Sequence, residues 1–538
     1  MRIPVKDIKN VGRFYLDYLT DFERVSEFYS LNYATKEAFG RQVEILTQRD
    51  YPRERLSQIL KKQNEKFGAP SETFRAIERL NAEKANIVIT GQQVGLFGGP
   101  MYVLYKALTA IKLARSLDDS GLGAVVPVFW VASDDSDFAE VNHANILDKQ
   151  KRQTRLEVER TVDGNVSMSR MIPGEQILKT IETFEESMHN SEFKDDIFEA
   201  VSSAYAPDVS LSDAFGRWLM QCLGDLGVVM IDPSDPEIRA LQAKVFVQEI
   251  LEGSPSTHAV LQTSRRLSEK GYSPQAPLRD GRLNLFLNDE ERLPLELSGD
   301  KVQTTDGKYI FSTEELAQIA QEQPERLSPN VILRGLTQDV VFPTIAYVGG
   351  PAEIAYFGQL KSAYEAFDVP MPILYPRKSA TIIENNIARI LEKRHMKVQD
   401  LWGDLEALIS AKARENLSGG LMDAFEKMKN DWPQELARLT DKVHALDPTL
   451  EKLLEITAGR IVNNIETLEK KAVQAEKRHS DVMRQQLTNA ATAVFPGGNL
   501  QERVLNFSPF LVKHGFDFIR DVYDQLDLAH FDHQIIRI

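Results

Sequence analysis

The chain has 538 residues, which is too long for a single hydrophobic core, so we expect two to four structural units. Its composition, 42% hydrophobic and 27% charged, is that of an ordinary globular protein and argues against long disordered regions. The formal net charge of −15 argues against general binding to nucleic acid, which requires a basic surface, but allows a local basic pocket for phosphate.

The cysteine content and the first residues predict a cytoplasmic protein. Cys222 is the only cysteine, which excludes an internal disulfide, and its apolar neighbours favour a buried structural thiol. The N-terminus contains no apolar signal segment. No run approaches the roughly 18 apolar residues that a membrane span needs, so we expect no membrane partner.

Residues 1–84 are predicted to form a helical segment that packs on the rest of the chain. From Ala85 the pattern changes to an apolar run (85–90), a glycine-rich loop, an amphipathic helix (102–117) and a second apolar run (124–132). Continuous apolar strands that alternate with helices are typical of a parallel sheet covered on both faces.

The same alternation returns further along the chain and predicts one α/β core, Rossmann-like and doubly wound, over residues 85–400. Its further strands are expected at 227–232, 344–348 and 372–375. Two stretches, about 145–172 and 280–312, alternate polar and apolar residues as antiparallel strands do. Turn signals at Asp280-Gly281 and Asp306-Gly307 accompany the second stretch. We interpret both stretches as β-rich insertions carried by the core.

The last quarter predicts a long antiparallel coiled coil over residues 415–492. Apolar residues recur at steps of four and three on both sides of Asp447-Pro448, which indicates a helix start, and Leu468 belongs to this seam. Pro433 is expected to kink or restart the first helix. Residues 493–538 should return to the core. The seam can pair within one chain or between two chains, and we expect a homodimer.

A glycine-rich loop follows the first predicted core strand, at the edge where parallel sheets bind ligands. Its glycines allow close backbone approach, and the helix after Pro100 offers free N–H groups to an anion. We predict substrate contacts for Thr90, Gly91, Gly95, Gly98 and Gly99, and catalytic roles for Gln92 and Gln93. The spacing matches neither a dinucleotide fingerprint nor a P-loop, and a plain tight turn is the alternative.

An acidic cluster follows the most apolar strand. Carboxylates there can hold a substrate ammonium group or a metal, and a histidine can act as a base. The candidates are Asp134, Asp135, Asp137 and His143 as catalytic residues and Asn142 as a substrate-binding residue. Their spacing is not diagnostic of a metal site, so we assign no metal ligand. A solvated acidic loop is the alternative.

A second Gly-Gly-Pro elbow ends the strand predicted at 344–348. Two such elbows at two strand ends predict two loops that face one crevice. The substrate-binding candidates here are Tyr347, Gly349, Gly350 and Glu353, with Arg334 upstream. A guanidinium group suits a carboxylate or a phosphate, although a structural ion pair is equally compatible with Arg334.

A basic turn follows the last predicted core strand, and more polar residues flank the coiled coil. Cations at the start of a helix suit nucleotide phosphates. The nucleotide-binding candidates are Arg377, Lys378, Ser379, Glu384, Asn385, Asn386, Arg503 and Asn506. The alternatives are an ordinary basic turn and residues that fix the base of the coiled coil.

These motifs together resemble one family. The segments TGQQVGLFGGP (90–100), VPVFWVASDDSDFAEVNH (126–143) and AYVGGPAEIAYFGQLK (346–361) are similar to those of the bacillithiol-biosynthesis cysteine-adding enzymes. The likeness covers essentially the whole chain, including the coiled coil. It implies a Rossmann-like core with inserted segments and a coiled-coil dimer.

The resemblance also implies a reaction, the addition of cysteine to glucosaminyl-malate in the last step of bacillithiol synthesis. Because amide formation from a carboxylate is uphill, we expect an adenine nucleotide, ATP or ADP, and leave a magnesium ion open. In this hypothesis the loop glycines hold the activated group, the aspartates bind the cysteine ammonium group, and Arg334, Arg377 and Lys378 neutralise malate or phosphate. A nucleotidyl- or glycosyltransferase, or a nucleotide-sensing coiled-coil scaffold, is the alternative.

Overall fold

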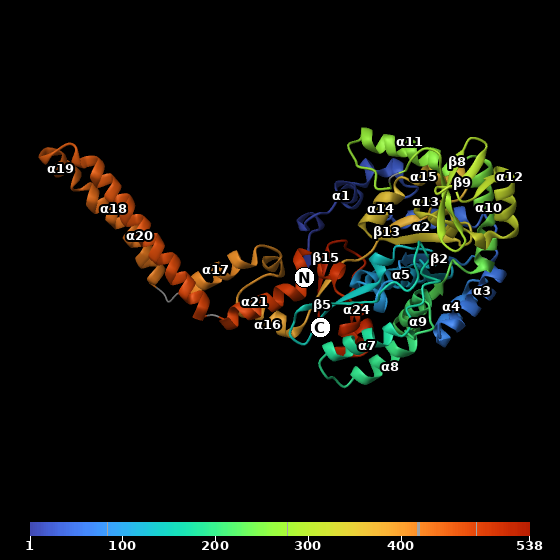
Figure 1. The fold of residues 1–538 in the computed structure, drawn as a ribbon, viewed down its shortest axis with the longest axis horizontal. Coiled ribbons are helices and arrows are strands. Elements are labelled where there is room, and N and C mark those ends of the chain that lie inside the picture. The colour runs from blue at the N-terminus through green and yellow to red at the C-terminus, as the bar shows by residue number, and fades with distance from the viewer. Residues whose placement is uncertain (83, 277, 417–419, 480) are drawn as a thin grey trace. The chain divides into compact units, whose positions relative to one another are not determined.

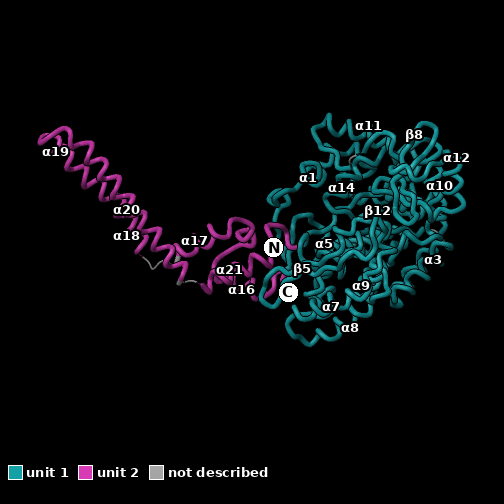
Figure 2. The backbone as a smooth tube through the Cα atoms, viewed as in Figure 1, with its two compact units in different colours: residues 1–382, 502–536, 538 teal, residues 383–501, 537 magenta. Residues whose placement is uncertain are grey.

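The computed structural model describes residues 1–82, 84–276, 278–416, 420–479 and 481–538. The chain forms two compact units (Figure 2). The first comprises residues 1–382, 502–536 and 538, and the second comprises residues 383–501 and 537. The first unit is therefore discontinuous in sequence. Residues 417–419 and 480 of the predicted coiled coil lie outside the described residues.

A five-stranded sheet forms the centre of the first unit (Figure 1). Its order is β13-β12-β2-β3-β6, and every pairing is parallel. The strands are β2 (Asn86–Gln92), β3 (Val125–Val131), β6 (Val229–Ile231), β12 (Thr344–Gly349) and β13 (Ile373–Pro376). β3, β6, β12 and β13 are buried along their whole length, as continuous apolar runs require. The predicted parallel α/β core is confirmed.

Helices cover both faces of this sheet. Along β3 the side chains alternate between two apolar clusters, because Val128 and Trp130 belong to one and Phe129 and Val131 to the other. Helix α5 (Met101–Asp119), which connects β2 to β3, packs on β2, β3 and β12. The helices of the first 82 residues also contact the sheet, with α2 (Lys36–Leu46) on β12 and β13, α3 (Arg53–Lys66) on β6, and α4 (Ser71–Arg79) on β3 and β6.

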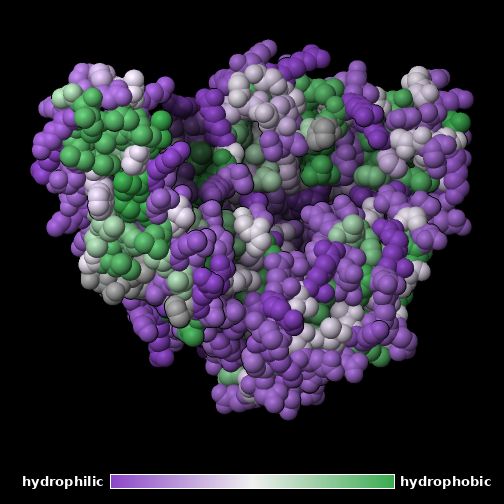
Figure 3. Space-filling model, turned by 60° about the vertical axis from the view of Figure 1, so that its left-hand side comes forward, coloured by the Kyte–Doolittle hydropathy of each residue, from purple (hydrophilic) through white to green (hydrophobic). Residues whose placement is uncertain are grey.

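Further helices of the first unit surround these layers. Before β12 they are α1 (Arg13–Thr20), α6 (Phe138–Val141), α7 (Gln176–Ser187), α8 (Lys194–Ala204), α9 (Leu211–Leu223), α10 (Pro236–Leu251), α11 (Pro255–Glu269), α12 (Thr313–Glu322) and α13 (Val331–Asp339). After β12 follow α14 (Pro351–Phe357) and α15 (Lys361–Ala366). No helix in the described ranges is long and apolar enough to cross a membrane. The face drawn in the space-filling view is mostly hydrophilic, with a patch of hydrophobic residues on its left-hand side (Figure 3).

The two predicted insertions form antiparallel sheets of different size. The first contains only one hairpin, β4 (His143–Leu147) with β5 (Gln153–Glu157), and residues 158–172 form no strand. The second is a sheet of order β10-β9-β8-β7-β11. Its strands are β7 (Arg282–Asn288), β8 (Arg292–Ser298), β9 (Lys301–Thr304), β10 (Ile310–Ser312) and β11 (Leu327–Pro329). The turn at Asp306-Gly307 joins β9 to β10 as predicted, whereas Asp280-Gly281 only precedes β7.

The second unit is helical, and two of its helices form the predicted antiparallel pair. Helix α18 (Leu421–Ala437) lies beside α20 (Leu450–His479), and Lys429 Nζ lies 3.0 Å from a carboxylate oxygen of Glu469 (Figure 1). Helix α18 continues past Pro433 to Ala437, so of the kink or restart expected there the restart does not occur. The other helices are α16 (Asn385–Lys393), α17 (Leu405–Asn416), α19 (Thr440–Leu446) and α21 (Asp481–Val494).

The C-terminal residues 502–536 belong to the first unit. They contribute to α22 (Gln501–Val504), α23 (Ser508–His514), α24 (Asp517–Gln525) and β15 (His533–Arg537). β15 pairs antiparallel with β1 (Arg2–Ile3) and lies between β1 and β14 (Ala380–Ile383). Both ends of the chain therefore meet in one small sheet.

The glycine-rich loop after β2 is shaped by close packing. Gly98 has a φ of +87°, and a Cβ atom there would lie 2.6 Å from the ring of Phe507. The Asn506 Nδ2 atom donates hydrogen bonds to the carbonyl oxygens of Phe97 (2.9 Å) and Gly99 (2.8 Å). Asn506 and Phe507 from the C-terminal part of the chain therefore pack inside the loop. The glycines allow the loop to turn from β2 into α5.

This packing predicts that Gly98→Ala is destabilising. Alanine would adopt a left-handed backbone conformation and press on Phe507, which should lower the free energy of unfolding by about 2–4 kcal/mol. Urea denaturation followed by circular dichroism measures this change. Gly40→Ala in α2 is the matched control, because no atom lies within 4 Å of its added Cβ. It should leave stability unchanged or raise it, and equal losses in both variants would contradict the prediction.

Candidate active site

One pocket of about 750 Å³ lies at the carboxyl end of the central sheet. The three stretches that the sequence singled out, 90–100, 133–143 and 347–353, meet around it. The predicted candidates in its wall are Gly91, Gln92, Gln93, Asp134, Asp135, Arg334, Tyr347, Gly350, Glu353, Arg377 and Arg503. The second sheet adds Phe286, Arg292 and Pro329. Parallel sheets bind their ligands at this edge.

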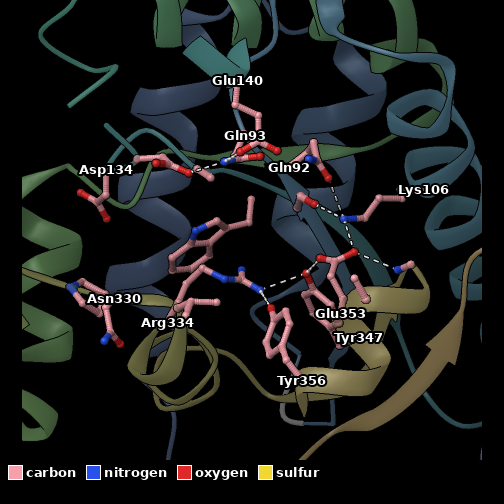
Figure 4. Close-up of a pocket in the computed structure, with 18 of the residues that line it drawn as sticks. Gln92, Gln93, Lys106, Asp134, Glu140, Asn330, Arg334, Tyr347, Glu353 and Tyr356 are labelled. Atoms are coloured by element: carbon pink, nitrogen blue, oxygen red, sulfur yellow. Dashed lines mark hydrogen bonds and ion pairs between the residues drawn. The ribbon is translucent and has the colours of Figure 1, made fainter. Parts of the chain in front are cut away.

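An ion pair between a buried lysine and a partly buried glutamate fixes one side of the pocket (Figure 4). The Nζ atom of Lys106, which is 1% exposed on α5, lies 2.6 Å from Oε2 of Glu353 in the first turn of α14. It also donates to the carbonyl oxygen of Gly91 and, at 3.0 Å, to Oε1 of Gln92. The Gly350 N–H group donates to Glu353 at 2.8 Å. One ammonium group thus joins the ends of β2 and β12.

Both members of this pair have shifted pKa values. Burial lowers the pKa of Lys106, and the charge of Glu353 opposes that shift. Burial acts to raise the pKa of Glu353, but Lys106 and the Gly350 N–H group outweigh it and leave the pKa below its ordinary value. The carboxylate is therefore ionised at neutral pH.

Two arginines form a cationic side of the pocket. Arg334 on α13 donates from Nη2 to the hydroxyl of Tyr347 (3.0 Å) and of Tyr356 (3.4 Å). The guanidinium of Arg292 on β8 lies 3.7 Å from the centre of the Phe286 ring. Within the described ranges neither arginine forms an ion pair with a carboxylate, so both charges can act on an anionic ligand.

An acidic side faces the same cavity. Asp134 forms an ion pair with the buried Arg239 of α10. Gln93 Nε2 donates to Oδ2 of Asp135 (2.6 Å) and to Oε2 of Glu140 (2.8 Å). In the part of the chain that the structure describes, Asp135 and Glu140 have no cationic partner. These two carboxylates can accept hydrogen bonds from a positively charged ligand group.

A further corner combines two arginines with an aromatic ring. Arg377 is buried and forms a two-pronged ion pair with Glu502 at 2.7 and 3.1 Å, and its guanidinium lies 5.6 Å from the Tyr102 ring centre. Arg503, the residue after Glu502, is exposed and lines the pocket. The last part of the chain therefore contributes charge to the site.

Several predicted residues of the glycine-rich elbows lie outside the pocket wall. The Thr90 hydroxyl donates to the Val348 carbonyl oxygen at 2.8 Å and joins β2 to β12. Gly95, Gly98, Gly99 and Gly349 are also absent from the wall. The expected glycine cradle is therefore not formed here, because the C-terminal segment occupies the loop.

Three residues of the acidic cluster also turn away from the pocket. Asp137 caps α6 by accepting the N–H group of Glu140, and Asn142 Nδ2 donates to the Val158 carbonyl oxygen at 3.1 Å. His143 begins β4, and its Nδ1 atom lies 3.2 Å from Oδ1 of Asn142. Burial lowers the pKa of His143 below its ordinary value. Asp137 therefore stabilises the start of α6, and Asn142 joins the beginning of the β4–β5 hairpin to the residue that follows it.

Most of the predicted nucleotide-binding residues have other contacts. Lys378 Nζ donates at 2.8 Å to the carbonyl oxygens of Leu528 and of His530, and burial lowers its pKa to about 7. Ser379 bonds to Glu502 and His533, and Asn506 holds the glycine-rich loop. Glu384, Asn385 and Asn386 belong to the second unit, at the start of α16. Arg377 and Arg503 remain in the pocket wall.

Several residues of the pocket wall were not among the candidates predicted from the sequence. Lys106 had a weak signal, since it is the first charge in the helix predicted at 102–117 and stands between apolar residues on both sides. Glu140 belongs to the acidic cluster but was not assigned a role. Arg292, Asn330 and Tyr356 had no local signal, because their positions depend on tertiary contacts. Among the described residues no group of three His, Cys, Asp or Glu side chains is arranged to hold a metal ion.

A pocket with opposed charges at the edge of a parallel sheet defines a small-molecule enzyme with a Rossmann-like core. A family model described as "Bacillithiol biosynthesis BshC, N-terminal Rossmann-like domain" matches residues 1–378. A second, described as "Bacillithiol biosynthesis BshC, C-terminal coiled-coil domain", matches residues 380–538. The chain belongs to the BshC family of bacillithiol biosynthesis, as its motifs predicted.

Relatives match over almost their whole length. The "Putative cysteine ligase BshC" of Salinibacter ruber is 33% identical, over 100% of this chain and 98% of its own. The protein of the same name from Prosthecochloris aestuarii is 32% identical, over 94% of this chain and 93% of its own. That from Symbiobacterium thermophilum is 32% identical, over 95% of each. These names agree with the prediction of an enzyme of the cysteine-ligase kind.

The ion pair between Lys106 and Glu353 predicts that Lys106→Met is destabilising. This change leaves the partly buried Glu353 carboxylate, whose side chain is 23% exposed, without its counter-charge, which should lower the free energy of unfolding by about 1–3 kcal/mol. Urea denaturation measures it. The double variant Lys106→Met/Glu353→Gln, which removes both charges, should recover much of the loss. If the double variant is as unstable as the sum of the single variants, the pair is not coupled as described.

Proposed function

We propose that this enzyme adds cysteine to glucosaminyl-malate by forming an amide bond, with a nucleotide that activates the cysteine carboxylate. The observation that carries the proposal is the pocket with an acidic side and a cationic side in one cavity. Cysteine brings an ammonium group and the malyl sugar brings two carboxylates. A site that joins them must hold both kinds of charge.

The acidic side supports binding of the amino acid. Asp135 and Glu140 already accept hydrogen bonds from one Gln93 amide, so their oxygens are held at fixed positions. An ammonium group between them would gain charge-assisted hydrogen bonds, which are shorter and stronger than neutral ones. Asp134 contributes less charge, because Arg239 neutralises it.

The cationic side supports binding of the malyl group. Arg334 is held by two tyrosine hydroxyls, and Arg292 is held by the Ser328 hydroxyl (3.0 Å) and the Pro329 carbonyl oxygen (2.7 Å). A planar guanidinium fork matches a carboxylate in two hydrogen bonds. Because both forks are held by neutral groups, their charge remains for the ligand.

The corner of Arg377, Arg503 and Tyr102 suits the phosphates and base of an adenine nucleotide. Arg503 supplies an exposed guanidinium, whereas Glu502 offsets the charge of Arg377. A nucleotide would supply the leaving group that a free carboxylate lacks, and a magnesium ion would accompany its phosphates. The residues of this chain would then hold the sugar amine and the cysteine carbonyl carbon in reach of each other.

The proposal predicts that two charge-removing variants impair different substrates. Asp135→Asn should raise the KM for cysteine, and Arg334→Met should raise the KM for glucosaminyl-malate, each by about tenfold or more because a charge-assisted hydrogen bond is lost. The measurement is steady-state amide formation with cysteine, glucosaminyl-malate and ATP. The control is Arg520→Met, an exposed residue of α24 away from the pocket.

Two outcomes would contradict this function. If both variants turn over like the wild type while remaining folded, the pocket does not hold these substrates. If the protein consumes a sugar nucleotide without needing cysteine, the transferase alternative is correct. Omission of ATP tests the activation step by itself.

The second unit supports the further proposal of a homodimer. Several apolar side chains of its helices are exposed in the single chain, including Trp432 (46%), Leu468 (56%) and Leu446 (81%). Leu468 was predicted in the seam, but it is not covered by the helix pair. Exposed apolar residues on paired helices are typical of surfaces that bind another helix.

A dimer through these helices should dissociate when charge is placed on that surface. Trp432→Glu combined with Leu468→Glu should shift the mass in solution from two chains to one, because a buried unpaired carboxylate is costly. Light scattering after size exclusion measures the mass. Asn430→Glu, exposed on the same helix, is the control. A wild-type protein with the mass of one chain would refute the dimer.

A further inference from the structure

A second cavity of about 420 Å³ lies beside the main pocket. Phe286 and Asn330 line both cavities, so the two are neighbours across these side chains. The remaining wall residues come from the start of β7, the preceding loop and β8. They are Leu278, Arg279, Arg282, Leu283, Asn284, Leu285 and Pro294.

The cavity lies where the second sheet is irregular. The register between β7 and β8 shifts between Arg282 and Phe286, and Pro294 stands opposite Phe286 without an N–H group to donate. On the other edge β7 remains paired with β11 at Leu285. The strands therefore leave space on one side of β7 while the sheet stays intact.

Two arginines line this space, the partly buried Arg282 and the exposed Arg279. The Nη1 atom of Arg282 is buried and has no hydrogen-bond partner. Within the described ranges, no carboxylate forms an ion pair with Arg279 or Arg282. A buried donor without an acceptor is costly, and in native proteins such a group usually contacts a water molecule or an ion. Among the described residues, the wall of the cavity supplies no hydrogen-bond acceptor for the Nη1 atom of Arg282.

The other polar groups of the wall are already satisfied. Asn284 Nδ2 donates to the hydroxyls of Ser256 (2.7 Å) and Thr257 (2.8 Å), and its Oδ1 accepts from Asn330 Nδ2 at 2.7 Å. The remaining wall is mostly apolar side chains of leucine, phenylalanine and proline. In such surroundings the attraction between a guanidinium and an anion is stronger than in water.

We propose that this second cavity binds an oxyanion, a phosphate or a carboxylate, through Arg282 and Arg279. The ring of Phe286 forms part of the wall of the second cavity. The guanidinium of Arg292, which lines the main pocket, stacks on the same ring. An anion in the second cavity would therefore hold Phe286, and through it Arg292, in place. This site is separate from the substrate contacts assigned above and does not depend on the proposed reaction.

The test is isothermal titration of the full-length protein with inorganic phosphate and, separately, with malate. Arg282→Met should weaken binding of one of these anions about tenfold or more, because a charge-assisted hydrogen bond is lost. Weaker phosphate binding identifies a phosphate site, and weaker malate binding identifies a carboxylate site. Unchanged binding of both anions overturns the proposal.

Two further variants separate this site from the main pocket and from misfolding. Arg334→Met removes a main-pocket cation and should leave the Arg282-dependent binding intact. Arg282→Lys keeps the charge and should recover part of the affinity that Arg282→Met loses. If Arg334→Met abolishes the same binding event, the anion lies in the main pocket and the second site is refuted. Because no turnover is measured, the result is independent of whether the enzyme joins cysteine to the malyl sugar.

Discussion

The ion pair of the buried Lys106 and the partly buried Glu353 is the interaction on which the geometry of the pocket depends. Lys106 reaches from α5 to the end of β2, and Glu353 anchors the start of α14 after β12. Taking two charges out of water is costly, and their attraction repays this only with good geometry and further hydrogen bonds. Both conditions are met here, because Gln92, Gly91, Gly350 and Tyr347 complete the bonds of the pair.

Hydrogen bonds that begin at this ion pair and at Gln93 position the other charged side chains of the pocket. The carboxylate of Glu353 accepts from Tyr347, and Tyr347 accepts from Arg334, so one chain of hydrogen bonds positions the cationic side. On the other side a single amide, that of Gln93, sets the spacing of Asp135 and Glu140. The two sides are thus arranged by neutral hydrogen-bonding groups. Their charges remain for ligands.

The sequence predicted the parts of the fold that local pattern determines. β3 was predicted because strands buried on both faces are apolar throughout, and the pocket stretches were predicted because they follow such strands. What it missed depends on distant contacts. The glycine-rich loop was expected to hold a ligand, but Asn506 and Phe507 fill it from the other end of the chain. No local pattern shows that Arg377 pairs with Glu502 or that Arg292 covers Phe286.

The discontinuity of the first unit has a consequence for biosynthesis. Glu502, Arg503 and Asn506 follow an excursion of roughly 120 residues through the second unit. At about 5–20 residues per second, a ribosome spends several seconds on this excursion after it has made Arg377. During that interval Arg377 lacks its counter-charge Glu502, and the glycine-rich loop lacks its contacts with Asn506. The nascent chain therefore cannot complete this part of the pocket until the excursion through the second unit has been translated, so the pocket matures later than the parallel sheet that carries it.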